Sequence, residues 1–153
     1  MENLFTDEET NLVDEISLEP NYRLEGTRNK IYIMEKKGFT IIYTDSKHIL
    51  LDLDTPEAFQ CYIDMFPQIQ QFLKITEKYR YHSKSGVGWH VVLELEDDMP
   101  VMDRITLQAL LGSDLKREWL SWDTIRRGLE TEEKFISILF QPPNSTIMMD
   151  IPA

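Results

Sequence analysis

The chain has 153 residues, a net charge of −11 and a hydrophobic fraction of 42%. This length suits one domain, residues 1–153, with a sizeable core. No apolar run approaches the ~20 residues of a membrane span. The start at Met1 lacks a basic, apolar leader, and Cys61 is the single cysteine, so we expect a cytoplasmic protein (the host cytoplasm if the protein is viral) without an intrachain disulfide.

The acidic charge is concentrated at the N-terminus. Residues 1–19 contain seven acids and no base, so the remaining 134 residues carry a net charge of only −4. Bases cluster within residues 74–84 and 116–127. A strongly acidic total disfavours a general nucleic-acid coat, because phosphate binding depends on Lys and Arg. Both a local basic patch and an acidic surface for a protein partner stay open.

The first predicted elements precede the main pattern. Residues 1–20 form an acidic N-terminal segment whose apolar residues recur at helical spacing, and Pro20 ends the expected helix. Residues 31–34 and 39–43 have strand composition, and residues 35–38 between them contain Gly38. This arrangement predicts a β-hairpin.

From residue 48 onward the expected order is strand, helix, two strands, two helices and a last strand. The expected strands are 48–53, 76–82, 89–95 and 135–140, and the expected helices are 55–72, about 105–111, and from residue 113 or 114 to 127. This βαββαβ order is shared by RNA-recognition (RRM) domains and ferredoxin-like domains. We therefore predict an α+β fold with an RRM/ferredoxin-like βαββαβ core, extended at the N-terminus by the helix and the β-hairpin.

Two carboxylates lie on one face of the first core strand. Side chains alternate along a strand, so Asp52 and Asp54 share a face. Two adjacent like charges favour a divalent cation between them. The first and third core strands are antiparallel neighbours in this topology, so we expect His90 beside both acids on the open face of the sheet. Alternatively, one of the two acids caps the helix that starts at Pro56.

A turn with serines and glycines leads directly into the strand that carries His90. It runs Ser83-Lys84-Ser85-Gly86-Val87-Gly88, followed by Trp89-His90. Together with the two carboxylates, this turn suggests a metal-dependent site that handles phosphates. The alternatives are an ordinary hairpin turn and a histidine that is packed and hydrogen-bonded.

These motifs resemble the catalytic core of the archaeo-eukaryotic primase superfamily, which includes primase-polymerases. The matching residues are Leu51-Asp52-Leu53-Asp54 and the stretch Ser85-Gly86-Val87-Gly88-Trp89-His90-Val91. Asp114 and then Arg126-Arg127-Gly128 match a weaker third motif. The resemblance covers about residues 45–140, and the chain looks most like short, single-domain members encoded by phages and prophages.

The resemblance implies a role for each motif. The implied ligands of Mg²⁺ or Mn²⁺ are Asp52, Asp54 and Asp114, and the implied catalytic residues are Asp52, Asp54 and His90. The implied contacts to a nucleoside triphosphate come from Ser85, Gly86, Gly88, His90, Arg126 and Arg127, the arginines neutralising the leaving pyrophosphate. Without the resemblance, Asp114 is a helix N-terminal acid and Arg126 and Arg127 are a solvated helix end. Trp119 and Trp122, three residues apart, are expected in the core, with base stacking as the alternative.

Two functions follow from these expectations. The first is a primase/polymerase-like enzyme of phage or mobile-element DNA replication, which transfers nucleotides to a single-stranded or primed nucleic acid. The second is a catalytically weak or inactive protein of the same fold, which binds a host or viral replication or defence protein through its acidic surface. Neither function involves a membrane. A small acidic α+β protein whose motifs are purely structural is the remaining alternative.

Overall fold

Two antiparallel sheets and four helices make up the part of the chain that the computed structural model describes, residues 23–131, 135 and 137–148. In chain order the elements are α2 (Arg23–Lys36), β1 (Thr40–Tyr43), β2 (His48–Leu53), α3 (Pro56–Ile69), β3 (Ile75–His82), β4 (Trp89–Leu95), α4 (Val101–Leu110), α5 (Leu115–Arg126) and β5 (Ile138–Gln141). The predicted α+β class and the βαββαβ-like order from β2 to β5 are confirmed. The predicted N-terminal helix lies outside the described residues. Within those residues, no helix is long and apolar enough to cross a lipid bilayer.

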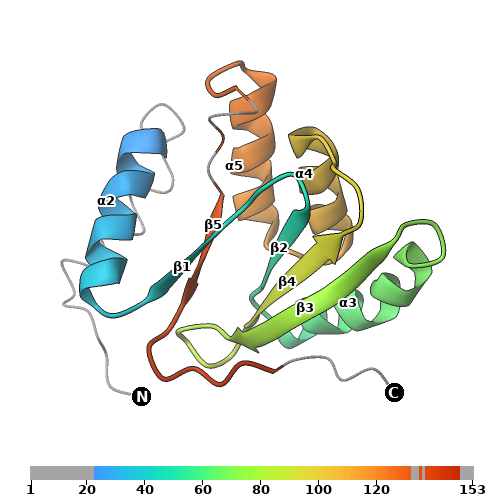
Figure 1. Ribbon diagram of the computed structural model, residues 1–153, viewed down its shortest axis with the longest axis horizontal. Coiled ribbons are helices and arrows are strands. Elements are labelled where there is room, and N and C mark those ends of the chain that lie inside the picture. The colour runs from blue at the N-terminus through green and yellow to red at the C-terminus, as the bar shows by residue number, and fades with distance from the viewer. Residues whose placement is uncertain (1–22, 132–134, 136, 149–153) are drawn as a thin grey trace.

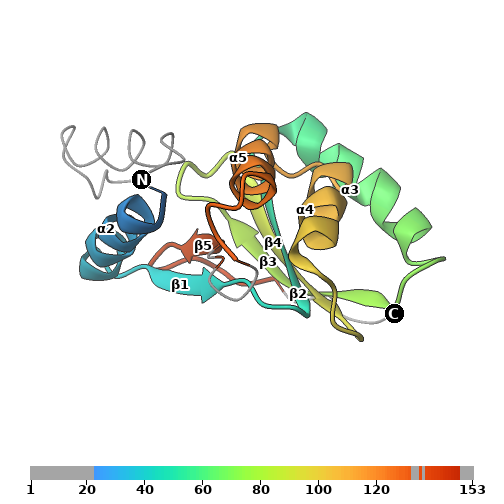
Figure 2. The same cartoon turned by 90° about the horizontal axis from the view of Figure 1, so that it is seen from above.

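Strands β2, β4 and β3 form the central sheet, in that spatial order. Figures 1 and 2 show α3, α4 and α5 gathered on one side of it. The side chains that face these helices alternate along the strands, as the sequence predicts, and form the main core: Ile49, Leu51, Leu53, Val91, Leu93 and Leu95, with Tyr62 and Phe66 from α3. A bulge between Glu77 and Tyr79 shifts the register of β3, so that Tyr81 pairs with His90 on the opposite side of the sheet.

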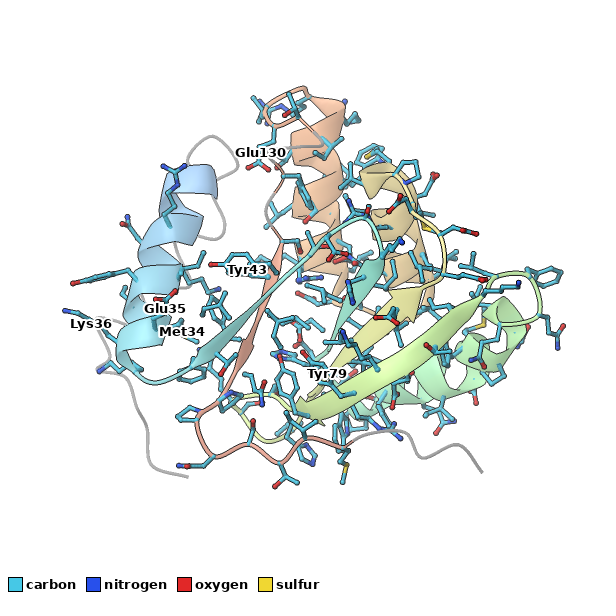
Figure 3. The ribbon with its side chains drawn as sticks, in the orientation of Figure 1. Met34, Glu35, Lys36, Tyr43, Tyr79 and Glu130 are labelled. Atoms are coloured by element: carbon cyan, nitrogen blue, oxygen red, sulfur yellow. The ribbon has the colours of Figure 1, made fainter. Side chains whose placement is uncertain are left out.

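That opposite side is only partly open, which corrects the expectation of a fully open face. Strand β5 pairs with β1 in a separate two-stranded sheet. This second sheet contributes Leu139 and Ile42 to a small core that contains Leu50 and Val92 of the central sheet. Tyr79 packs into the same core and lies between the two sheets (Figure 3). Asp52 and His90 lie beside this cover, and their side chains are 22% and 12% exposed.

The predicted β-hairpin over residues 31–43 is wrong in its first strand, because residues 31–34 belong to helix α2. The stretch 35–38 ends this helix and does not form a hairpin turn. Gly38 has a φ of +86°, and the amide of Phe39 donates to the carbonyl of Met34 at 3.1 Å. This is the pattern of a glycine that terminates a helix. Met34 is only 1% exposed, so tertiary packing overrides the strand propensity of this stretch.

Candidate functional site

Within the part of the chain that the structure describes, no fourth strand pairs with the outer edge of β2, and side chains and one loop amide close this edge instead. The closing hydrogen bonds are Leu50 N to Gln108 Oε1 (3.1 Å), Arg117 Nη1 to Leu50 O (3.2 Å), Asp52 N to Ser113 Oγ (3.0 Å) and Asp114 N to Asp52 O (2.7 Å). Buried strand-edge groups need such partners. Because these partners come from α4, from α5 and from the junction between them, the junction is held directly beside Asp52.

Three carboxylates meet at this point. Asp52, Asp54 and Asp114 each offer an oxygen, and these oxygens lie within 4.8 Å of one another, so the group could hold a metal ion. Asp114 also caps α5, since its Oδ2 accepts from the amide of Arg117 at 3.3 Å. Its two predicted roles are therefore compatible. Asp54 is not a helix cap, because the side chain of Thr55 caps α3.

Asp52 and Asp54 differ in their tendency to carry charge. Burial opposes the charge on Asp52, but the contact from His90 Nε2 to Asp52 Oδ1 at 3.2 Å outweighs it and lowers the pKa of Asp52 to about 2. Burial, followed by the nearby carboxylates of Asp52 and Asp114, raises the pKa of Asp54 to about 7. A second negative charge among these carboxylates therefore costs free energy unless a cation binds between them.

His90 is packed and oriented as well as paired with Asp52. The two residues are direct cross-strand partners, and the outward-facing amide and carbonyl of Asp52 make them a non-hydrogen-bonded pair, in which side chains lie closest. The ring of Tyr81 meets the His90 ring edge-on at 5.2 Å between centroids. Among the described residues, neither His90 Nδ1 nor the buried hydroxyl of Tyr81 has a hydrogen-bond partner. Buried polar groups without a partner are uncommon in protein interiors.

A cleft of about 320 Å³ opens over Asp52, Asp54 and His90. Its lining also includes Ser83, Lys84 and Ser85 of the loop between β3 and β4, Lys30 and Met34 of α2, and Phe140 of β5. The cleft therefore has one wall from the central sheet and another from α2 and the second sheet. Its volume lies at the lower end of the range for small-molecule sites.

Gly88 allows the loop over residues 83–88 to lie close to the end of β2, next to Asp54. A Cβ at Gly88 would lie 2.6 Å from the carbonyl oxygen of Leu53, so only glycine permits this approach. Gly86 has a φ of +76°, and its amide donates to the carbonyl of Ser83 at 2.9 Å. The Gly86 amide thus serves the turn. Of the loop residues predicted to contact phosphate, Ser85 is the one that lines the cleft.

Arg126 and Arg127 are not brought to this site. Asp114 stands at the start of α5 and the two arginines at its end, about 18 Å away along a 12-residue helix. There both guanidinium groups bind Asp123. Of the bases that the structure describes, Lys30 and Lys84 line the cleft, and Arg117 lies near Asp52 and Asp54; sequence reasoning did not assign Arg117 to the site. Lys84 lies next to the serine-glycine motif, so its place at the site could have been predicted from the sequence. Lys30 lies next to the stretch that was wrongly predicted to be a hairpin strand, so its place could not.

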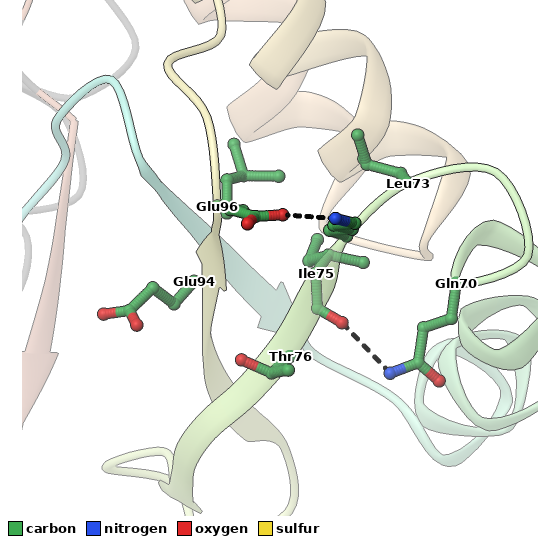
Figure 4. A pocket seen from close by; sticks show the side chains of 8 residues that line it. Gln70, Leu73, Ile75, Thr76, Glu94 and Glu96 are labelled. Carbon is green, nitrogen blue, oxygen red and sulfur yellow. Dashed lines mark hydrogen bonds and ion pairs between the residues drawn. The ribbon is translucent and has the colours of Figure 1, made fainter.

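A second hollow, of about 480 Å³, lies at the opposite end of the central sheet, away from His90 (Figure 4). It is lined by Gln70, Leu73, Lys74, Ile75, Thr76, Glu94, Leu95 and Glu96. Its charged and amide groups already have partners: Lys74 Nζ lies 3.3 Å from Glu96 Oε2, and Gln70 Nε2 donates to the carbonyl of Ile75 at 3.0 Å. Glu94 pairs with His48 and Lys78, outside the hollow. This hollow has no cluster of titratable groups comparable to the carboxylates.

The family of the chain is not identified by similarity to known proteins. No protein family matches the sequence, and neither a curated protein nor a solved structure matches it. The resemblance to the primase superfamily therefore rests on the two motifs and stays a prediction. The functional argument depends on the geometry of the cleft.

Proposed function

We propose that the cleft binds a nucleoside triphosphate together with Mg²⁺ or Mn²⁺ and transfers its nucleotide to a single-stranded or primed nucleic acid. The observation that carries the proposal is the meeting of Asp52, Asp54 and Asp114 with His90 beside a serine- and lysine-bearing loop. Carboxylate oxygens are hard ligands, which suit Mg²⁺ and Mn²⁺ better than softer metals.

Each residue would contribute a separate part of the reaction. Asp52, charged at neutral pH because His90 contacts it, would be a permanent metal ligand. Asp54 would release its proton when the metal binds, since its pKa lies near 7. Ser85 and Lys84 would receive the phosphates at the mouth of the cleft. Bound metal ions would activate the attacking 3′-oxygen and stabilise the departing oxygen.

Calorimetric titration with a nucleoside triphosphate and Mn²⁺ tests the binding step. The catalytic step is tested by incubation with labelled nucleotides, a primed template and Mn²⁺. We expect extension by the wild-type protein and by Asp97→Ala, a control that removes an exposed acid outside the cluster. Extension that survives the double substitution Asp52→Ala and Asp54→Ala would exclude this cleft as its source. A flat titration of the wild-type protein would overturn the proposal and favour the catalytically inactive binding protein.

A further inference from the structure

The second wall of the cleft offers a cation that the sequence motifs did not point to. Lys30, on the third turn of α2, lines the cleft together with Asp52 and Asp54. Its Nζ lies 5.4 Å from the centre of the Phe140 ring, within cation–π range. The aromatic ring thus holds the ammonium group at the cleft surface.

The position of Lys30 is fixed by the second sheet. Met34, one turn further along α2, is almost fully buried. Phe140 belongs to β5 and pairs with Ile41 of β1. Helix α2 and the β1–β5 sheet therefore form one support that presents Lys30 to the cleft, while Lys84 reaches it from the loop after β3. The two lysines belong to opposite walls.

We infer that Lys30 binds the outer phosphates of the nucleotide and makes the cleft selective for triphosphates over monophosphates. The inference rests on the proposed function, because it concerns the same ligand. A triphosphate brings more negative charge than a monophosphate into a cleft that is already lined by Asp52 and Asp54, with Asp114 close to them, and so it needs more cations. A phosphate next to the loop can be met by Lys84 and the metal. Further phosphates extend toward the other wall, where Lys30 stands and the predicted Arg126 and Arg127 are absent.

The test compares two ligands of different phosphate number. We would titrate ATP and AMP, each with Mn²⁺, into the wild-type protein and into Lys30→Met, which keeps the length of the aliphatic chain. The matched control is Lys36→Met, because Lys36 lies on the same helix but contacts Tyr32, with its Nζ 4.7 Å from that ring. Lys30→Arg, which retains the charge, is the second variant.

We expect Lys30→Met to weaken ATP binding at least about tenfold, the effect of one lost charge-assisted hydrogen bond, and AMP binding less than about twofold. Lys36→Met should leave both affinities unchanged, and Lys30→Arg should retain most of the affinity for ATP. Unchanged ATP binding in Lys30→Met, or an equal loss for ATP and AMP, would overturn this inference alone. A wild-type protein that binds neither nucleotide would overturn the proposed function as well.

Discussion

Substitution of Asp54 by asparagine should stabilise the metal-free protein at neutral pH and reduce its stabilisation by Mn²⁺. The carboxyl of Asp54 has an ordinary pKa of 3.8 and a pKa of about 7 in the folded protein. The folded state therefore keeps a proton that the unfolded state has already lost. The contribution of Asp54 to the free energy of unfolding is fully present below about pH 4. It is lost as the pH rises toward 7, because the folded state must then accept an unfavourable charge.

The magnitude follows from the separation of the charges. Two unit charges 4.8 Å apart, the upper limit in this cluster, repel by about 1 kcal/mol in water and by about 3.5 kcal/mol at an effective dielectric constant of 20. The cleft encloses part of the Asp54 side chain, but the residue as a whole is exposed, so solvent screening favours the lower part of this range. We therefore expect Asp54→Asn to raise the free energy of unfolding by about 1–2 kcal/mol at pH 7.5.

Chemical denaturation between pH 4.5 and 8, with and without Mn²⁺, measures both effects. Asp54→Asn should lose less stability than the wild-type protein as the pH rises, and should gain less from Mn²⁺, because one ligand is missing. Asp97→Asn removes an exposed acid outside the cluster and should follow the wild-type profile. Parallel pH profiles of the Asp54→Asn and wild-type proteins would refute the electrostatic reasoning.

Three further predictions concern neighbouring residues. Asp114→Asn keeps a good helix cap and should lower Mn²⁺ affinity by at least about tenfold in a calorimetric titration without destabilising the metal-free protein; unchanged affinity would exclude Asp114 as a ligand. Gly88→Ala, whose Cβ would lie 2.6 Å from a carbonyl oxygen, should cost more than about 2 kcal/mol in denaturation, whereas Gly86→Ala, with open space around it, should cost about 1 kcal/mol. Glu118→Leu should lower the free energy of unfolding by about 3–5 kcal/mol, because it leaves the Arg117 charge without its buried partner. Adding Arg117→Met to this variant should recover more than about 1 kcal/mol of that free energy. A double variant that is less stable than Glu118→Leu would contradict this account.

Local rules were sufficient to predict the central sheet and the contact between Asp52 and His90. Alternation along a strand assigns each side chain to a face, and the βαββαβ order places β2 beside β4. The two rules together predicted that Asp52 and His90 would meet, and the structure confirms it at 3.2 Å. The prediction needed only the order of the elements from residue 48 onward and the position of each residue within its strand.

The second wall of the cleft could not be predicted in the same way. The pairing of β1 with β5 joins residues about 100 positions apart, and nothing in either short strand specifies the partner. Helix α2 contains Ile31-Tyr32-Ile33, whose strand propensity is overridden by the burial of Met34. These non-local contacts determine the position of Lys30, so its place in the cleft could not be predicted from the sequence.

The diversion of β5 to the second sheet also explains why a third carboxylate reaches the cluster. If β5 paired with the outer edge of β2, strand–strand hydrogen bonds would occupy the amide and carbonyl of Asp52. Instead, the Asp52 amide binds Ser113, and its carbonyl accepts from the amide of Asp114 at 2.7 Å. The need to satisfy a buried strand edge thus fixes the α4–α5 junction at this point. Asp114, the first residue after that junction's serine, is held beside Asp52 and Asp54 for the same reason.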